Sequence, residues 1–176
     1  ETCNHNHEDF LALKVLESHL SFGMSSVLFD LFREQNGLSY DVGIFNPIRK
    51  QNAPFLIYLS VSSKKAKLAL KLLLNLWNKI LINKIDNEEI KLAKIKLKNS
   101  ILINNQTIED IVLRKVQLIG FKMNPNFDNQ NLEKLKEINS EKILEVSQKY
   151  FKKPFLSVLG EKRICDDIHG IWKSFD

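Results

Sequence analysis

Arg33 and Tyr40 are the two side chains whose types and spacing could do chemistry together. They stand on either side of Asn36-Gly37 in the stretch "FDLFREQNGLSYDVGIFN", residues 29–46. A tight reversal at Asn36-Gly37 would bring the guanidinium and the phenol to the same side of the protein. We expect both polar tips to be solvent-accessible and to converge on one concave surface. A structural role is also open, because Arg33 could bond the last carbonyls of its own helix and Tyr40 could fill a sheet edge.

The histidines at the start of the chain approach a zinc motif without completing it. His5 and Glu8 fit H-x-x-E-H, but Asp9 stands where the second histidine would be. That motif works on a helix, where its two histidines share one face. Here the residues precede the first predicted helix, on a segment that we expect to be loose, with Asp9 capping the helix. We therefore expect no metal ligands in this chain.

Other kinds of catalytic site are also incomplete in the sequence. No G-x-S-x-G motif and no glycine-rich phosphate loop occur, and Ser25 and Ser26 are best explained as helix caps. Two cysteines, Cys3 and Cys165, are too few for a disulfide framework, which predicts a reducing compartment, cytoplasmic or organellar. By motif alone, the chain contains no complete catalytic site.

Composition indicates a globular protein with an ordinary core. The 176 residues are 44% hydrophobic and 27% charged, which suits a single domain spanning 1–176. The longest apolar stretch, 68–82, is interrupted by lysine and asparagine, so we expect no membrane span. The net charge of +5 comes mainly from lysines on predicted helices, without interleaved aromatics. Solvated helix faces explain this better than a nucleic-acid surface, although a basic nucleic-acid-binding domain stays open as a third reading.

Hydrophobic periodicity and capping residues place the elements that would position Arg33 and Tyr40. Strands are too few for a doubly wound parallel sheet, and the two central ones should pair as a hairpin. The predicted fold class is α+β, an antiparallel sheet with helices packed on one face. We expect helices at 9–20, 25–36, 62–82, 86–104, 107–120, 132–137 and 139–151, a short helix in the tail 161–176, and strands at 38–45, 55–62 and 155–160.

The segment around the candidate pair resembles a known family. "LSFGMSSVLFDLFREQNGLSY", residues 20–40, is similar to a segment of the pitrilysin/insulinase family of zinc metallopeptidases, which includes the mitochondrial processing peptidase. That segment has a glycine, a Ser-Ser-x-Leu-Phe helix, Arg-Glu and Gly-Leu-x-Tyr. "IDNEEIKLAKIKLKNSI" and the late "INSEKILEVSQKYFKKPFLSVLG" also resemble the family. The likeness extends over about residues 9–160.

The resemblance implies a role for the whole chain. Such peptidases have two similar halves around a chamber, and the first carries H-x-x-E-H and a distal glutamate that bind zinc. This chain resembles the second, C-terminal half, which lacks zinc ligands and lends an arginine and a tyrosine. Arg33 and Tyr40 match that pair, so the resemblance implies that they hold peptide substrate and stabilise the oxyanion of the scissile carbonyl.

The resemblance also sets what we expect of partners. The chain alone should be inactive, hold no cofactor, and act with a partner half that carries zinc. The family's half opens with a strand before the position of Asp9, and that strand is not present here, which predicts an unpaired sheet edge and self-association. Val27 replaces an arginine often found after the Ser-Ser pair. The alternative is a proteolytically inactive homologue that acts as a scaffold or regulatory subunit.

Overall fold

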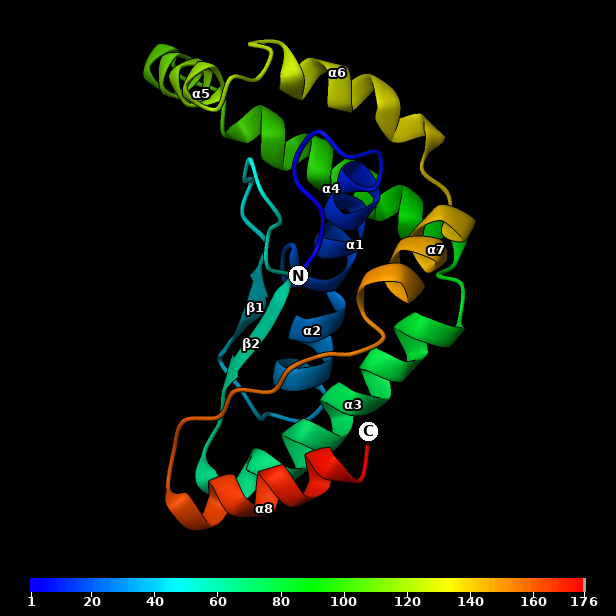
Figure 1. The fold of residues 1–176 in the computed structure, drawn as a ribbon, viewed down its shortest axis with the longest axis vertical. Coiled ribbons are helices and arrows are strands. Elements are labelled where there is room, and N and C mark those ends of the chain that lie inside the picture. Colours follow the sequence, from blue (N-terminus) through cyan, green and yellow to red (C-terminus); the bar gives the residue numbers. More distant parts are fainter. Residues whose placement is uncertain (176) are drawn as a thin grey trace.

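The computed structural model describes residues 1–175 as one small two-stranded sheet with helices on one side of it and at its two ends (Figure 1). The fold class is α+β, as the sequence predicts. None of the helices in the described part of the chain is long and apolar enough to cross a lipid bilayer. In chain order the elements are α1 (Phe10–Ser21), α2 (Val27–Phe29), the π-helical η1 (Asp30–Glu34), β1 (Asp41–Phe45), β2 (Leu56–Ser60), the 3-10 turn η2 (Ser63–Lys65), α3 (Ala66–Ile82), α4 (Asn87–Ile103), α5 (Ile108–Gly120), α6 (Phe127–Lys134), the 3-10 turn η3 (Leu135–Glu137), α7 (Ser140–Tyr150) and α8 (Lys162–Lys173).

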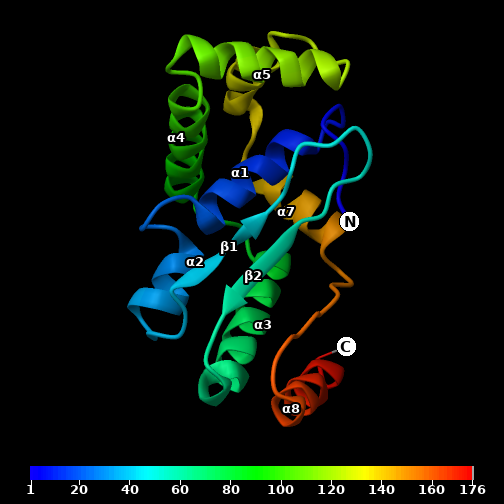
Figure 2. The same cartoon turned by 90° about the vertical axis from the view of Figure 1, so that its left-hand side faces the viewer.

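The two strands form the predicted antiparallel hairpin. Asp41 lies opposite Ser60, and Phe45 lies opposite Leu56. The alternate residues Val42, Ile44, Ile57 and Leu59 pack on the main core. Turning the molecule by 90° places the hairpin in front and helices α1, α3 and α7 behind it (Figure 2). Helices therefore cover one face of the sheet, while Phe45, Leu56 and Tyr58 remain about half exposed.

Helix α1 lies at the centre of the packing and is buried on nearly every side. Leu13, Val15, Leu16 and Leu20 are at most 1% exposed, and the helix contacts β1, α4 and α7. Burying a side chain of this size contributes about 1.5–3 kcal/mol. The buried hydroxyl of Ser18 donates to the carbonyl of Ala93 at 2.8 Å, which joins α1 to α4. This helix forms the base on which the hairpin rests.

Several capping predictions are confirmed. Asp86, Thr107 and Asn139 each accept a hydrogen bond from a backbone N–H in the first turn of α4, α5 and α7. The predicted tail helix is α8, and its Ile168 packs with Leu70 and Leu74 of α3. The helix predicted at 132–137 begins earlier, at Phe127, and ends in a 3-10 turn.

The prediction of a closing strand at 155–160 is wrong. The segment has no ladder partner among the described residues, and Phe155 and Leu159 are 98% and 102% exposed. A strand needs a neighbour that accepts and donates its backbone hydrogen bonds. The apolar run indicated burial, but a run of this kind carries no information about whether such a neighbour exists.

The N-terminal segment is docked, not loose. Thr2 N–H donates to the carbonyl of Ala53 at 2.7 Å, and His5 Nδ1 lies 2.6 Å from the carbonyl of Arg49. Thr2, Cys3 and His5 are all at least 94% buried. The loop between the two strands supplies carbonyls that the first residues need, and sequence spacing gave no sign of this long-range pairing.

Asp9 occupies the cap position of α1, but its side chain makes no cap hydrogen bond. The carboxylate instead reaches α7, where it lies 2.8 Å from Lys142 Nζ and 2.6 Å from Lys149 Nζ. The hydroxyl of Tyr150 also donates to it at 2.8 Å. Asp9 is completely buried, so an oppositely charged partner is worth more to it than one backbone N–H. The cluster therefore fastens α7 to the start of α1.

This cluster fixes the protonation of its members. Burial by itself would raise the pKa of Asp9, but hydrogen bonds from Lys142, Lys149 and Tyr150 outweigh it and hold the pKa well below its usual value. Burial, helped by the hydrogen bond to Asp9, raises the pKa of the Tyr150 phenol. Burial also raises the pKa of the Cys3 thiol, so Cys3 is not an activated thiolate.

We predict that Asp9→Asn lowers the free energy of unfolding at pH 7 by about 2–3 kcal/mol, since both lysines lose a buried counter-charge. The pKa of Asp9 is depressed on folding, so its contribution is complete above about pH 4 and is lost as the pH falls further. The difference in the free energy of unfolding between wild type and variant, measured with urea, should therefore narrow below pH 4.

Glu145→Gln is the matched control, because Glu145 also pairs with Lys142 but is 63% exposed. This substitution should lower the free energy of unfolding by less than about 0.5 kcal/mol. Equal losses in the two variants would contradict the assignment.

Candidate functional site

The helix that carries Arg33 ends in a π-helical turn, η1. The N–H of Gln35 donates to the carbonyl of Asp30 at 2.9 Å, one residue further back than an α-helix allows. The carbonyl of Leu31, which would have accepted that N–H, accepts instead from Nδ2 of Asn36 at 2.8 Å. A π turn is rare and is frequently found at functional sites. Asn36, which the sequence marked only as a helix breaker, is thus the residue that makes this wider turn tolerable.

Gly37 then reverses the chain. Its φ is +56°, in the left-handed region that favours glycine, and its N–H donates to the carbonyl of Arg33 at 3.0 Å. The carbonyl of Phe32 accepts two N–H groups, from Leu38 at 2.7 Å and from Ser39 at 3.1 Å. This is the left-handed turn that the Asn-Gly pair predicts.

Ser39 fixes the start of the following strand. Its side chain is almost fully buried, and its hydroxyl lies 2.7 Å from the carbonyl of Ser60 and 2.8 Å from that of Asp41. Tyr40 therefore projects from a backbone that is held on one side by the helix end and on the other by the end of β2. Nothing in the sequence pattern singled out Ser39.

Arg33 and Tyr40 lie together. The guanidinium carbon of Arg33 is 5.3 Å from the centre of the Tyr40 ring, and it is 4.7 Å from the ring of Phe29. Tyr40 is 87% exposed, so it does not fill the core, and no described residue bonds its hydroxyl. Phe29 was not among the predicted site residues, although its i, i+4 spacing from Arg33 is a signal for a side-chain pair.

Among residues 1–175, most of the hydrogen-bonding capacity of Arg33 is unused. Its one contact with a carboxylate there joins Nε to Oε1 of Glu34 at 3.7 Å, too long for a hydrogen bond. The side chain is 42% exposed. The structural role considered for Arg33, bonding the carbonyls of its own helix end, is not what its side chain does among the described residues.

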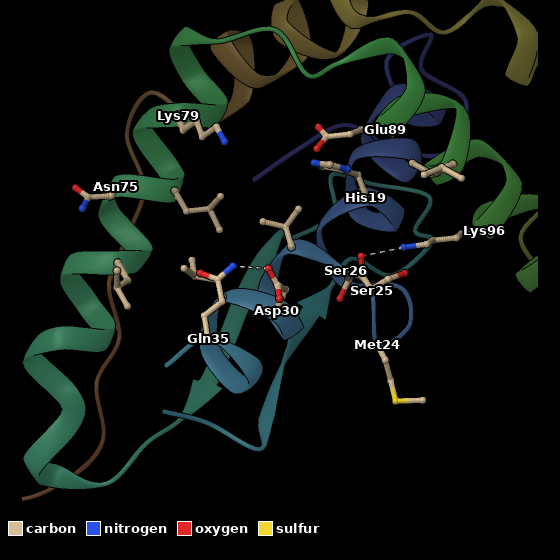
Figure 3. A pocket seen from close by; sticks show the side chains of 16 residues that line it. His19, Met24, Ser25, Ser26, Asp30, Gln35, Asn75, Lys79, Glu89 and Lys96 are labelled. Atoms are coloured by element: carbon tan, nitrogen blue, oxygen red, sulfur yellow. Dashed lines mark hydrogen bonds between the residues drawn. The ribbon is translucent and has the colours of Figure 1, made fainter. Parts of the chain in front are cut away.

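A groove of about 680 Å³ lies behind the π turn, between α1, α3 and α4 (Figure 3). Asp30 and Gln35 form its edge on the side of the turn, joined by a hydrogen bond of 2.5 Å, while His19 and Glu89 face one another at the other end. Burial lowers the pKa of His19, although the charge of Glu89 acts in the opposite direction. Arg33 and Tyr40 are not among the residues that line this groove.

The described residues contain no cluster of three or more histidine, cysteine, aspartate or glutamate side chains placed to hold a metal ion. The Nδ1 atom of His5 is engaged by the carbonyl of Arg49, and Nδ1 of His7 accepts the N–H of Asp9 at 3.1 Å. These histidines therefore serve the docking of the N-terminal segment.

Comparisons with solved structures establish the fold independently. The chain is similar to the peptidase M16 inactive domain from Pseudomonas fluorescens, with 21% identity, a TM-score of 0.73, and coverage of 84% of this chain and 35% of that one. A protease from Helicobacter pylori gives 18% identity, a TM-score of 0.74, and coverage of 86% and 37%. The inactive peptidase domain of a candidate zinc protease from Bordetella parapertussis gives 12% identity, a TM-score of 0.70, and coverage of 85% and 81%.

The chain thus spans only about a third of the length of the first two structures. No curated protein sequence matches it. The family model described as "Peptidase M16 inactive domain" matches residues 1–97, which is more than half of the chain and includes Arg33 and Tyr40. The chain therefore belongs to the peptidase M16 inactive-domain family, the non-zinc, C-terminal-type half of pitrilysin-like metallopeptidases.

Proposed function

We propose that this chain is the non-zinc half of a zinc metalloendopeptidase and that Arg33 and Tyr40 act on the peptide substrate. In this proposal residues 1–176 work as one domain opposite a partner half, in the same chain or a separate subunit. The observation that carries the proposal is the position of the Arg33 guanidinium, which is held beside Tyr40 while its N–H donors stay free. Membership of the inactive-domain family supports the division of labour between the halves.

The chemistry required of this half is electrostatic. Zinc in the partner half would activate the water that attacks the scissile carbonyl. Negative charge then grows on the carbonyl oxygen, and a guanidinium or phenol fixed within hydrogen-bonding distance stabilises it. The planar donor edge of the Arg33 guanidinium can also hold a substrate carbonyl next to the scissile bond.

The surroundings of the pair suit this role. Both residues project from backbone that the Phe32 carbonyl and the Ser39 hydroxyl hold in place, so the donors are aligned before substrate arrives. The uncovered face of the hairpin carries Phe45, Leu56 and Tyr58, which are 48%, 49% and 42% exposed. A partner half that closes over this face would exclude water from the scissile bond.

We predict that the chain alone binds no stoichiometric zinc, whereas its assembly with the partner half binds one zinc per assembly. The donor sets that zinc requires are not assembled in the described residues. Metal analysis after exhaustive dialysis measures both values. One zinc per isolated chain, lost on changing His5 or His7, would contradict the proposal, and an assembly without zinc would favour the scaffold alternative.

We predict that Arg33→Lys and Tyr40→Phe each lower the turnover of the assembled enzyme about 10- to 1,000-fold, the range for loss of an oxyanion donor. Affinity for the partner half should not change, because both substitutions nearly preserve shape. Turnover of a quenched fluorescent peptide and light scattering measure the two properties. Arg163→Lys, an exposed position on α8, is the matched control and should leave turnover unchanged. Near-normal turnover in the Arg33→Lys/Tyr40→Phe double variant would overturn the assignment.

A further inference from the structure

We propose that Phe29 is a positioning residue, which holds the guanidinium of Arg33 by stacking so that its hydrogen-bond donors stay available to substrate. This inference rests on the proposed function of Arg33 and extends it to a residue that neither the family match nor the sequence motif assigns. Its basis is that the guanidinium of Arg33 lies near two aromatic rings, those of Phe29 and Tyr40.

The distances are those of cation–π contacts. The guanidinium carbon is 4.7 Å from the centre of the Phe29 ring and 5.3 Å from the centre of the Tyr40 ring, both within the range of about 6 Å. The planar guanidinium stacks on aromatic faces more readily than an ammonium group does. Two rings from opposite sides of the Gly37 reversal thus limit the motion of one exposed side chain.

The kind of contact that holds the Arg33 guanidinium decides whether its N–H donors remain available. A carboxylate clamp would immobilise Arg33 equally well, but it would occupy the N–H groups and neutralise the charge. Aromatic faces contact only the plane of the guanidinium and leave the edge with its donors uncovered. Arg33 is not clamped by its neighbour Glu34, whose Oε1 lies 3.7 Å from Nε, while its guanidinium carbon lies over the rings of Phe29 and Tyr40.

Phe29 itself has no better structural explanation. Its neighbours Leu28 and Phe32 are at most 1% exposed and belong to the main core, whereas Phe29 is half-buried and lies outside that core. A phenylalanine left outside the core in a short helix gains little from burial. Its i, i+4 placement before Arg33 gives it a specific partner, and the π turn Asp30–Glu34, which contains Arg33, begins directly after Phe29.

The first test needs only this chain. The Arg33 Nε–H signal in nitrogen-15 NMR should show an upfield ring-current shift and an order parameter above about 0.8, and Phe29→Leu should reduce the shift and lower the order parameter below about 0.6. Phe29→Tyr, which retains the ring, should preserve both. Leu31→Ala is the matched control, because Leu31 lies in the same turn, packs on the core and carries no aromatic ring. An unchanged Arg33 signal in Phe29→Leu, or an equal change in Leu31→Ala, would overturn the inference.

The second test uses the assembled enzyme and a quenched peptide that the wild type cleaves, selected from a mixed-sequence library. Phe29→Leu should lower turnover about 3- to 30-fold in the presence of Arg33, and should have no further effect in an Arg33→Ala background. Phe29→Tyr should restore turnover to within about twofold. An equal loss in both backgrounds would mean that Phe29 acts through stability alone. If Arg33→Ala leaves turnover unchanged, the proposed function fails, and the NMR result alone decides whether Phe29 holds Arg33.

Discussion

The backbone carbonyl of Phe32 accepts the N–H groups of both Leu38 and Ser39, and the geometry of the site depends on this double acceptance. It requires the chain to change from helix to strand within a few residues, which only a left-handed residue at Gly37 permits. A side chain at that φ would cost about 1–2 kcal/mol. Because the reversal is so tight, a residue of the last helical turn and a residue before the first strand meet, and they are Arg33 and Tyr40.

The rest of the fold keeps that reversal in place. Helix α1 packs against β1 of the hairpin, and the buried carboxylate of Asp9, just before α1, joins it to α7. Its buried residues Leu13, Val15, Leu16 and Leu20 contribute hydrophobic stabilisation, and Ser18 adds a hydrogen bond to α4. The pair is therefore attached to a packed core, while Tyr40 is 87% exposed and the side chain of Arg33 is 42% exposed. This combination suits the role that we propose for the pair, opposite a partner half.

Local sequence signals predicted what depends on local physics. The caps at Asp86, Thr107 and Asn139, the left-handed turn at Gly37 and the antiparallel hairpin all follow from residue types at fixed short spacings. The proximity of Arg33 and Tyr40 also followed, since one turn determines it.

Features that depend on distant partners were missed. Asp9 looked like a cap because it directly precedes α1, and its ion pairs with distant residues of α7 could not be predicted from the sequence. The segment 155–160 looked like a strand because it is apolar, but it has no ladder partner among the described residues. The π turn was missed for another reason, since it depends on one side chain, Asn36, that satisfies a carbonyl left free by the wider turn.

The central claim is that the tips of Arg33 and Tyr40 meet the oxygen that becomes negatively charged. The most direct measurement is a crystal structure of the assembled enzyme with a phosphinic peptide, whose tetrahedral phosphinate imitates the attacked carbonyl. The account predicts an Arg33 nitrogen and the Tyr40 hydroxyl about 2.7–3.1 Å from phosphinate or neighbouring peptide oxygens, with the Phe29 ring still stacked on the guanidinium. A phosphinate bound at the zinc with both tips more than about 5 Å from every inhibitor oxygen, beyond the reach of a hydrogen bond, would contradict it.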